Sequence, residues 1–102
     1  MARVSILEVS GPDCGTYADG EKVSKAIALL LRSKESVQLD FAGVRVVSSS
    51  FFNGVIGESL QTFGEENLLS RLSFLNMKGQ DKFVFERTLN SIRKKRENVI
   101  GV

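Results

Sequence analysis

Three consecutive serines, Ser48, Ser49 and Ser50, are the residues whose types and spacing most plainly suggest chemistry. A helix that begins at hydroxyl residues offers free backbone N–H groups and the positive end of its dipole, so it can hold a phosphate group on a ligand or on a serine. Serine is also a favoured N-cap residue, but capping explains one serine and not three. The triplet is therefore the candidate functional site.

The residues on either side of the triplet predict the elements that position it. Val37, Leu39 and Phe41 alternate with polar residues, which predicts a buried strand before the serines. After the serines, apolar residues recur at helical spacing from Phe52 onward, and Gly64 provides a C-terminal stop. The triplet is thus expected at the N-terminus of a helix.

The rest of the chain alternates predicted strands with predicted helices, which implies a largely parallel or mixed sheet with covered faces. We expect an α/β fold that forms a single small domain over residues 1–102, with about four strands and about three helices. The other predicted elements are a strand at residues 4–9, a helix capped by Asp19 that stops near Ser33, a short β-prone piece at residues 44–47, a helical turn at residues 67–69, a strand at Leu72–Leu75 and a helix capped by Asp81.

Composition excludes several classes of enzyme. The chain contains no histidine, which removes a Ser-His-Asp triad, a Cys-His pair and every zinc signature that uses histidine. Gly15 and Gly20 have the spacing of a P-loop, but Glu21 takes the place of the lysine that must reach the phosphates. We expect no catalytic residue, no cofactor and no enzymatic activity.

The carboxylates and the cysteine do not form a predicted metal or catalytic site. Asp13 and Asp19 have ordinary turn and cap functions. Asp40 lies between two apolar strand residues, and its carboxylate is expected near the serines, where it either orders the loop or contacts a ligand. Cys14 has no neighbouring base in the sequence, so a spectator thiol is expected.

A set of residues around the triplet carries a family resemblance: Leu39, Asp40 and Phe41, then Val44, then the serines followed by Phe51, with Gly20 and residues 72–76 further out. This pattern resembles the core of the STAS domain, which is named for sulfate transporters and anti-sigma factor antagonists. The chain is more similar to a bacterial STAS-like domain of unknown function, in which serines also run into a phenylalanine. The resemblance covers most of the chain.

In the antagonist branch the equivalent motif is aspartate-serine-serine-glycine, and its first serine accepts phosphate from a partner kinase that is also an anti-sigma factor. The resemblance implies that Ser49 is the phospho-acceptor, while Ser48 and Phe51 stand where that motif has its aspartate and its glycine. A phosphoserine carries a charge of about −1.5 to −2, which a helix N-terminus favours and an acidic partner surface repels. The implied partner- or anion-binding residues are Ser48, Ser50, Phe51, Asp40, Thr16 and Gly20.

The resemblance implies a non-enzymatic regulatory module that binds a protein partner, a histidine-kinase-like ATPase or an anti-sigma factor, through the serine-capped helix. Ser49 phosphorylation would switch that binding, and an exposed Phe51 or Phe52 would anchor the partner. The alternative is a small-ligand or nucleotide sensor that uses the same helix start. A third interpretation, a DNA-contacting domain, rests on the basic run from Arg93 to Arg96, but this run fits the solvated end of a helix and includes no aromatic residue, so nucleic acid is not expected.

Charge and hydropathy predict a cytoplasmic protein. The net charge of +2 is too small to indicate a nucleic-acid binder, and the longest apolar run, residues 26–31, is far too short to cross a membrane. The N-terminus lacks the pattern of a secretory signal, and a single cysteine fits a reducing compartment. Val99, Ile100 and Val102 are expected to pack on their own domain or on a neighbouring chain, which leaves a homo-oligomer open.

Overall fold

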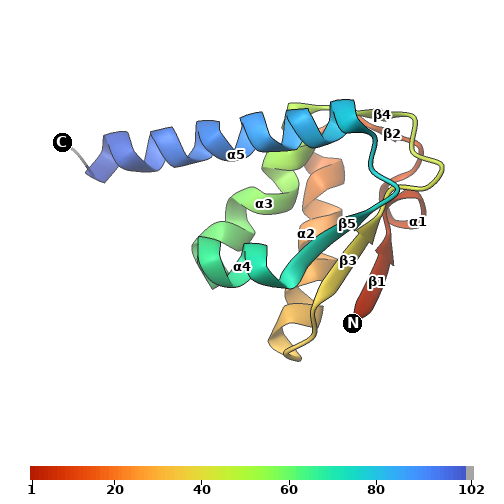
Figure 1. Ribbon diagram of the computed structural model, residues 1–102, viewed down its shortest axis with the longest axis horizontal. Coiled ribbons are helices and arrows are strands. Elements are labelled where there is room, and N and C mark those ends of the chain that lie inside the picture. The colour runs from red at the N-terminus through yellow and green to blue at the C-terminus, as the bar shows by residue number, and fades with distance from the viewer. Residues whose placement is uncertain (101–102) are drawn as a thin grey trace.

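The larger of two sheets in the described part of the chain has three parallel strands. The computed structural model describes residues 1–100, with the side chains of residues 1–95. Strands β1 (Ala2–Ser5), β3 (Val37–Asp40) and β5 (Leu72–Leu75) pair in the order β1-β3-β5 (Figure 1). The register sets Leu39 of the central strand opposite Val4 on one side and Phe74 on the other. The predicted strands around Leu39 and at Leu72–Leu75 are confirmed.

A second, two-stranded sheet lies beside the first. Strand β2 (Asp13–Cys14) pairs in parallel with β4 (Val46–Val47). A turn after β3, with Gly43 at φ 81°, separates the two β-prone pieces of this region, so the second piece pairs with β2 and not with β3. The α/β class is therefore confirmed, whereas the prediction of one sheet of about four strands is wrong.

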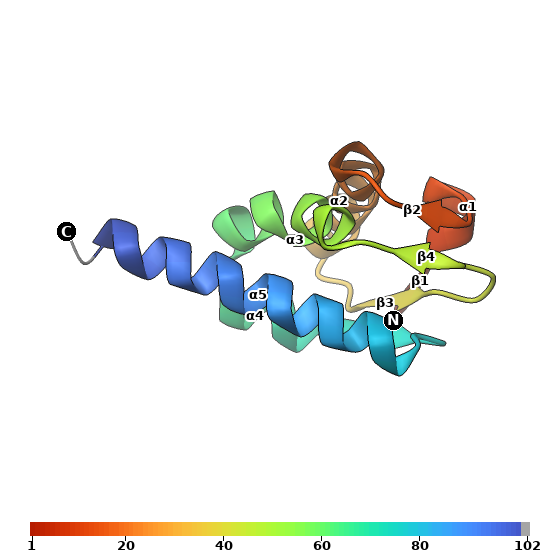
Figure 2. The same cartoon turned by 90° about the horizontal axis from the view of Figure 1, so that it is seen from above.

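The structure has more helices than the three expected. Helices α2 and α3 lie side by side, and α5 runs along one side of the molecule with its C-terminal end extending past α3 and α4 (Figures 1 and 2). The expected helical turn at residues 67–69 is part of α4. The helices are α1 (Ile6–Ser10), α2 (Tyr17–Arg32), α3 (Ser49–Phe63), α4 (Glu65–Arg71) and α5 (Gly79–Ile100).

Helix α1 replaces the second half of a predicted strand. The side chain of Ser5 accepts a hydrogen bond of 3.2 Å from the backbone N–H of Glu8, so Ser5 ends β1 and caps a helix. Ile6 is fully buried and holds this short helix to the core. The predicted strand at residues 4–9 is correct only as far as Ser5, because alternating apolar residues do not reveal a serine that caps.

Two predicted helix caps are also corrected. Thr16 caps α2, since its Oγ1 accepts a hydrogen bond of 3.1 Å from the N–H of Asp19, and Asp19 lies inside the first turn. In the same way Asp81 lies in the first turn of α5, which begins at Gly79. An acidic residue in the first turn complements the helix dipole without capping the helix. The predicted helix ends at Ser33 and Gly64 are confirmed.

Phenylalanine rings join the sheet, α3 and α5. Phe52 of α3 contacts Phe41 after β3 at 6.2 Å between ring centroids and Phe85 of α5 at 5.3 Å. Phe85 also contacts Phe74 of β5 at 4.8 Å. The two pairs that Phe85 forms are edge-to-face, and such pairs stabilise beyond their buried area. This cluster fixes α5 against the first half of α3, the region that contains the serines.

Among the described helices, none combines the length and the apolar content that crossing a membrane requires. The predicted packing of Val99, Ile100 and Val102 concerns side chains that the structure does not describe.

Candidate functional site

Ser48 connects the start of α3 to the loop after β2. Its Oγ accepts a hydrogen bond of 3.1 Å from the N–H of Phe51 and donates one of 3.0 Å to the carbonyl of Gly15. Its backbone N–H donates to the carbonyl of Cys14 at 3.0 Å. Ser48 is therefore the N-cap of α3, and the loop at Gly15 lies beside the helix start.

Ser49 and Ser50 have a different environment. Both residues are exposed in the first turn of α3, and their hydroxyl groups make no hydrogen bond within the part of the chain that the structure describes. The expected surface position of these two hydroxyls is confirmed. Capping thus uses one serine of the triplet and leaves two available to other molecules.

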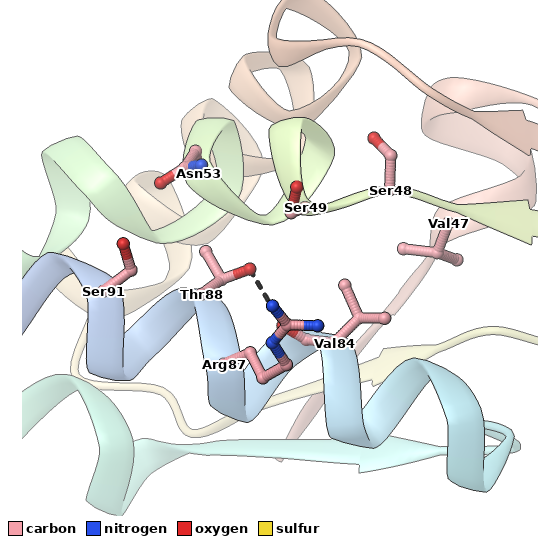
Figure 3. Close-up of a pocket in the computed structure, with 8 residues that line it drawn as sticks. All are labelled: Val47, Ser48, Ser49, Asn53, Val84, Arg87, Thr88 and Ser91. Atoms are coloured by element: carbon pink, nitrogen blue, oxygen red, sulfur yellow. Dashed lines mark hydrogen bonds between the residues drawn. The ribbon is translucent and has the colours of Figure 1, made fainter.

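A surface pocket of about 390 Å³ opens between the start of α3 and the face of α5 (Figure 3). Ser49 and Asn53 belong to the α3 side, and Arg87 and Ser91 belong to the α5 side. The lining residues are Val47, Ser48, Ser49, Asn53, Val84, Arg87, Thr88 and Ser91. The pocket is polar and contains one cation, and no carboxylate is among these eight residues.

The α5 side of this pocket was not predicted as part of the site. Arg87, Thr88 and Ser91 lie on one side of α5, whereas Phe85 and Leu89 of the same helix are buried in the core. Their spacing of one, three and four residues is typical of a shared helical face and could have indicated a polar face. Nothing in the spacing indicates that this face lies against the serines.

Asp40 is held by groups other than the serines. Its Oδ1 accepts hydrogen bonds from the backbone N–H of Ala42 at 3.0 Å and from Nδ2 of Asn76 at 2.9 Å. The Asn76 side chain, followed by the Ala42 N–H, lowers the pKa of Asp40 below its usual range, because both bonds favour the ionised form. Asp40 thus orders the turn after β3 and links it to the end of β5.

Two predicted binding residues are corrected. Gly20 is buried where α2 packs on α3, and a Cβ at this position would lie 2.8 Å from the N atom of Val55 and 2.9 Å from Cα of Gly54. Its N–H donates to the carbonyl of Thr16, so it does not line an anion site. Phe51 is fully buried, as is Phe52, so neither ring can anchor a partner. Both phenylalanine rings pack in the hydrophobic core, although they lie at the start of a helix whose serines are exposed.

The segment from β2 to the start of α2 contains a buried thiol and a helix cap. Thr16 is exposed and its Oγ1 is used to cap α2. Burial, with the charge of Asp19 as a smaller cause, raises the pKa of the Cys14 thiol to about 11, so the thiol stays protonated at neutral pH.

Asp13 pairs with Arg45 at 2.9 Å. Within the described residues, no group of three acidic or thiol side chains is arranged to hold a metal ion.

The basic end of α5 is partly engaged inside the domain. Arg93 donates from Nε to Oε1 of Glu65 at 2.8 Å and from a terminal nitrogen to Oε2 at 3.2 Å, which ties α5 to the start of α4. Lys94 and Lys95 are exposed. The side chain of Arg96 lies outside the described residues. Arg93 therefore supports the fold and is not free for a nucleic-acid phosphate.

A family model described as a STAS-like domain of unknown function (DUF4325) matches residues 19–82. This segment is more than half of the 102 residues and extends from the first turn of α2 to the first turn of α5. The chain therefore belongs to the family of STAS-like domains of unknown function. No curated protein and no solved structure matches it.

Proposed function

We propose that this protein is a non-enzymatic regulatory module that binds a protein partner through the start of α3. One observation carries the proposal: within the described residues, the exposed hydroxyls of Ser49 and Ser50 make no hydrogen bond, while Ser48 caps the helix. A capped helix start needs only one of these serines. Helix capping therefore does not account for the hydroxyl groups of the two exposed serines.

Ser49 is the proposed switch of this surface. It follows the N-cap directly, so a phosphoryl group on its Oγ would lie at the positive end of a helix of 15 residues, where negative charge is stabilised. The domain would tolerate the modification. A partner with an acidic or apolar surface would not, because the dianion adds repulsion and a desolvation cost.

The partner class follows from the family resemblance. The antagonist branch of STAS domains binds a histidine-kinase-like ATPase that is also an anti-sigma factor, and the first serine of its motif corresponds to Ser49. Because Phe51 stands buried where that motif has glycine, the contact surface here consists of Ser49, Ser50 and neighbouring exposed groups of the helix.

Binding to the full chain as bait in extract from the source cell tests this proposal. We expect wild type and Ser49→Ala to retain one common protein partner and Ser49→Asp to lose it. Gln61→Glu is the matched control, because it adds the same charge at an exposed position near the other end of α3. Equal binding by Ser49→Asp and by wild type would contradict the proposal.

A nucleotide sensor is the second candidate, favoured by the pocket beside Ser49. The pocket has room for a small ligand, but none of its eight lining residues is aromatic, so it offers no platform for base stacking. Thermal shift with ATP and GTP tests this candidate, since a ligand at 100 times its dissociation constant stabilises by about 2.7 kcal/mol.

A further inference from the structure

The pocket between α3 and α5 contains a cation that no acidic side chain neutralises within the described residues. Arg87 takes part in none of the ion pairs described, and its guanidinium carbon lies 5.8 Å from the centre of the Phe83 ring. By contrast, Arg45 and Arg93 pair with carboxylates at 2.9 Å and 2.8 Å. Arg87 is thus available to an anion that enters the pocket.

The remaining polar groups of the pocket fit the same kind of ligand. The hydroxyls of Ser49 and Ser91 and the side-chain amide of Asn53 make no hydrogen bond within the described residues. Thr88 is already satisfied, because its Oγ1 donates to the carbonyl of Val84 at 2.8 Å. A cation with several free donors and no carboxylate is suited to a tetrahedral oxyanion, which the planar guanidinium can bind through two hydrogen bonds.

Ser49 links this pocket to the proposed switch. Its side chain lines the pocket from α3, and Arg87 lines it from α5 (Figure 3). An oxyanion attached to Ser49 would therefore enter the volume where Arg87 is available. Arg87 lies beyond residues 19–82, so the family match gives no information about it.

We propose that Arg87 binds a phosphoryl group in this pocket and that Ser49 carries this group after phosphorylation. The inference rests on the proposed function, in which Ser49 is the phospho-acceptor. In that modification a kinase transfers the terminal phosphoryl group of ATP to Ser49 Oγ. The bond between that phosphorus and ADP breaks, the Oγ–P bond forms, and the hydroxyl proton is released. Arg87 is a positioning residue that then ties the modified start of α3 to α5.

The test uses the full chain with phosphoserine incorporated genetically at position 49 and follows its ³¹P resonance between about pH 4 and 9. Because Arg87 stabilises the dianion, Arg87→Gln is expected to raise the second pKa of the phosphoserine by about half a unit. Lys94→Gln removes an exposed cation of the same helix outside the pocket and is expected to leave this pKa unchanged. Equal pKa values in wild type and Arg87→Gln would overturn the proposal.

A second arm separates a covalent phosphoryl group from a free one. Inorganic phosphate is titrated into the unmodified protein while the amide resonances of Ser49, Asn53 and Ser91 are followed. One outcome is that the unmodified pocket binds phosphate through Arg87 while the phosphoserine pKa is the same in wild type and in Arg87→Gln. This outcome would assign the pocket to a free ligand and overturn the proposal. Arg87 is exposed, so Arg87→Gln should fold, and its amide spectrum verifies this.

The outcome is independent of the partner experiment. Incorporated phosphoserine needs neither a kinase nor a partner, so loss of the Arg87 effect would remove this inference and leave the proposed function intact. Conversely, equal partner binding by wild type and Ser49→Asp would contradict the proposed function, while the effect of Arg87→Gln on the phosphoserine pKa could still be measured.

Discussion

The two sides of helix α3 differ in what their residues contact. On the side toward α2, Gly54 faces Gly20 across a backbone contact, and the hydroxyls of Ser24 and Ser59 share a buried hydrogen bond of 3.0 Å. On the side toward the pocket, Ser49 is exposed, and its hydroxyl makes no hydrogen bond to the part of the chain that the structure describes. The first side fixes the helix and the second leaves groups available for binding. Stability and binding should therefore respond to different substitutions in one helix.

The largest expected effect is on the packed side. Gly54→Ala would place a Cβ 3.0 Å from the N atom of Glu21 and from Cα of Gly20, and closer still to the carbonyl of Tyr17. Because these are backbone atoms of α2, the helices must separate, at a cost of about 1–3 kcal/mol. Chemical denaturation measures this loss of free energy of unfolding.

Gly57→Ala is the matched control for Gly54→Ala. Apart from the backbone of its own helix turn, a Cβ at Gly57 meets no atom within 4 Å, so the substitution is expected to stabilise the helix by about 0.5–1 kcal/mol. Two glycines one turn apart would then change stability in opposite directions. Equal destabilisation by both alanines would mean that the close α2–α3 contact is not what requires Gly54.

A smaller effect on stability is expected at the serines, where substitutions of the adjacent residues Ser48 and Ser49 should differ. Ser48→Ala removes the cap of α3 and the bond to Gly15 and should lower the free energy of unfolding by about 0.5–2 kcal/mol. Ser49→Ala removes no internal bond within the described residues and should stay within about 0.5 kcal/mol of wild type. Thermal unfolding of the pair measures this. A larger loss for Ser49→Ala than for Ser48→Ala would reverse the assigned roles.

The smallest effect concerns Asp40, away from both sides of α3. Asn76→Gly removes the side-chain donor while keeping the left-handed backbone, φ 57°, that Asn76 adopts. The pKa of Asp40 should then rise toward its usual range, as measured by NMR titration. Because the lowered pKa favours the folded state, this stabilisation is present above the unfolded pKa and is lost as pH falls through the folded pKa. An unchanged pKa would contradict the assigned cause.

The sequence predicted the layout of the site better than its details. Alternation at Val37 to Phe41 and helical spacing after Phe52 are local patterns, so the strand, the helix and the surface hydroxyls could be predicted from neighbours in the chain. The cap residue could not be chosen among the three serines, because the choice depends on the carbonyl of Gly15, which a parallel strand pair brings to Ser48.

Long-range packing explains the predictions that were wrong. Phe51 and Gly20 were assigned to binding from the family resemblance, yet tertiary contacts bury both. Arg87 was not predicted as a site residue, because its position opposite Ser49 depends on the aromatic cluster that holds α5 against α3. Tertiary contacts of this kind leave no signal in the spacing of residues along the chain.

Mass spectrometry of the protein isolated from its native cell under several growth states tests the central claim most directly. The account predicts a phosphopeptide in which the modification is localised to Ser49, and not to the capping residue Ser48, in at least one state. Complete absence of Ser49 phosphopeptide in every state, with the unmodified peptide well covered, would contradict it.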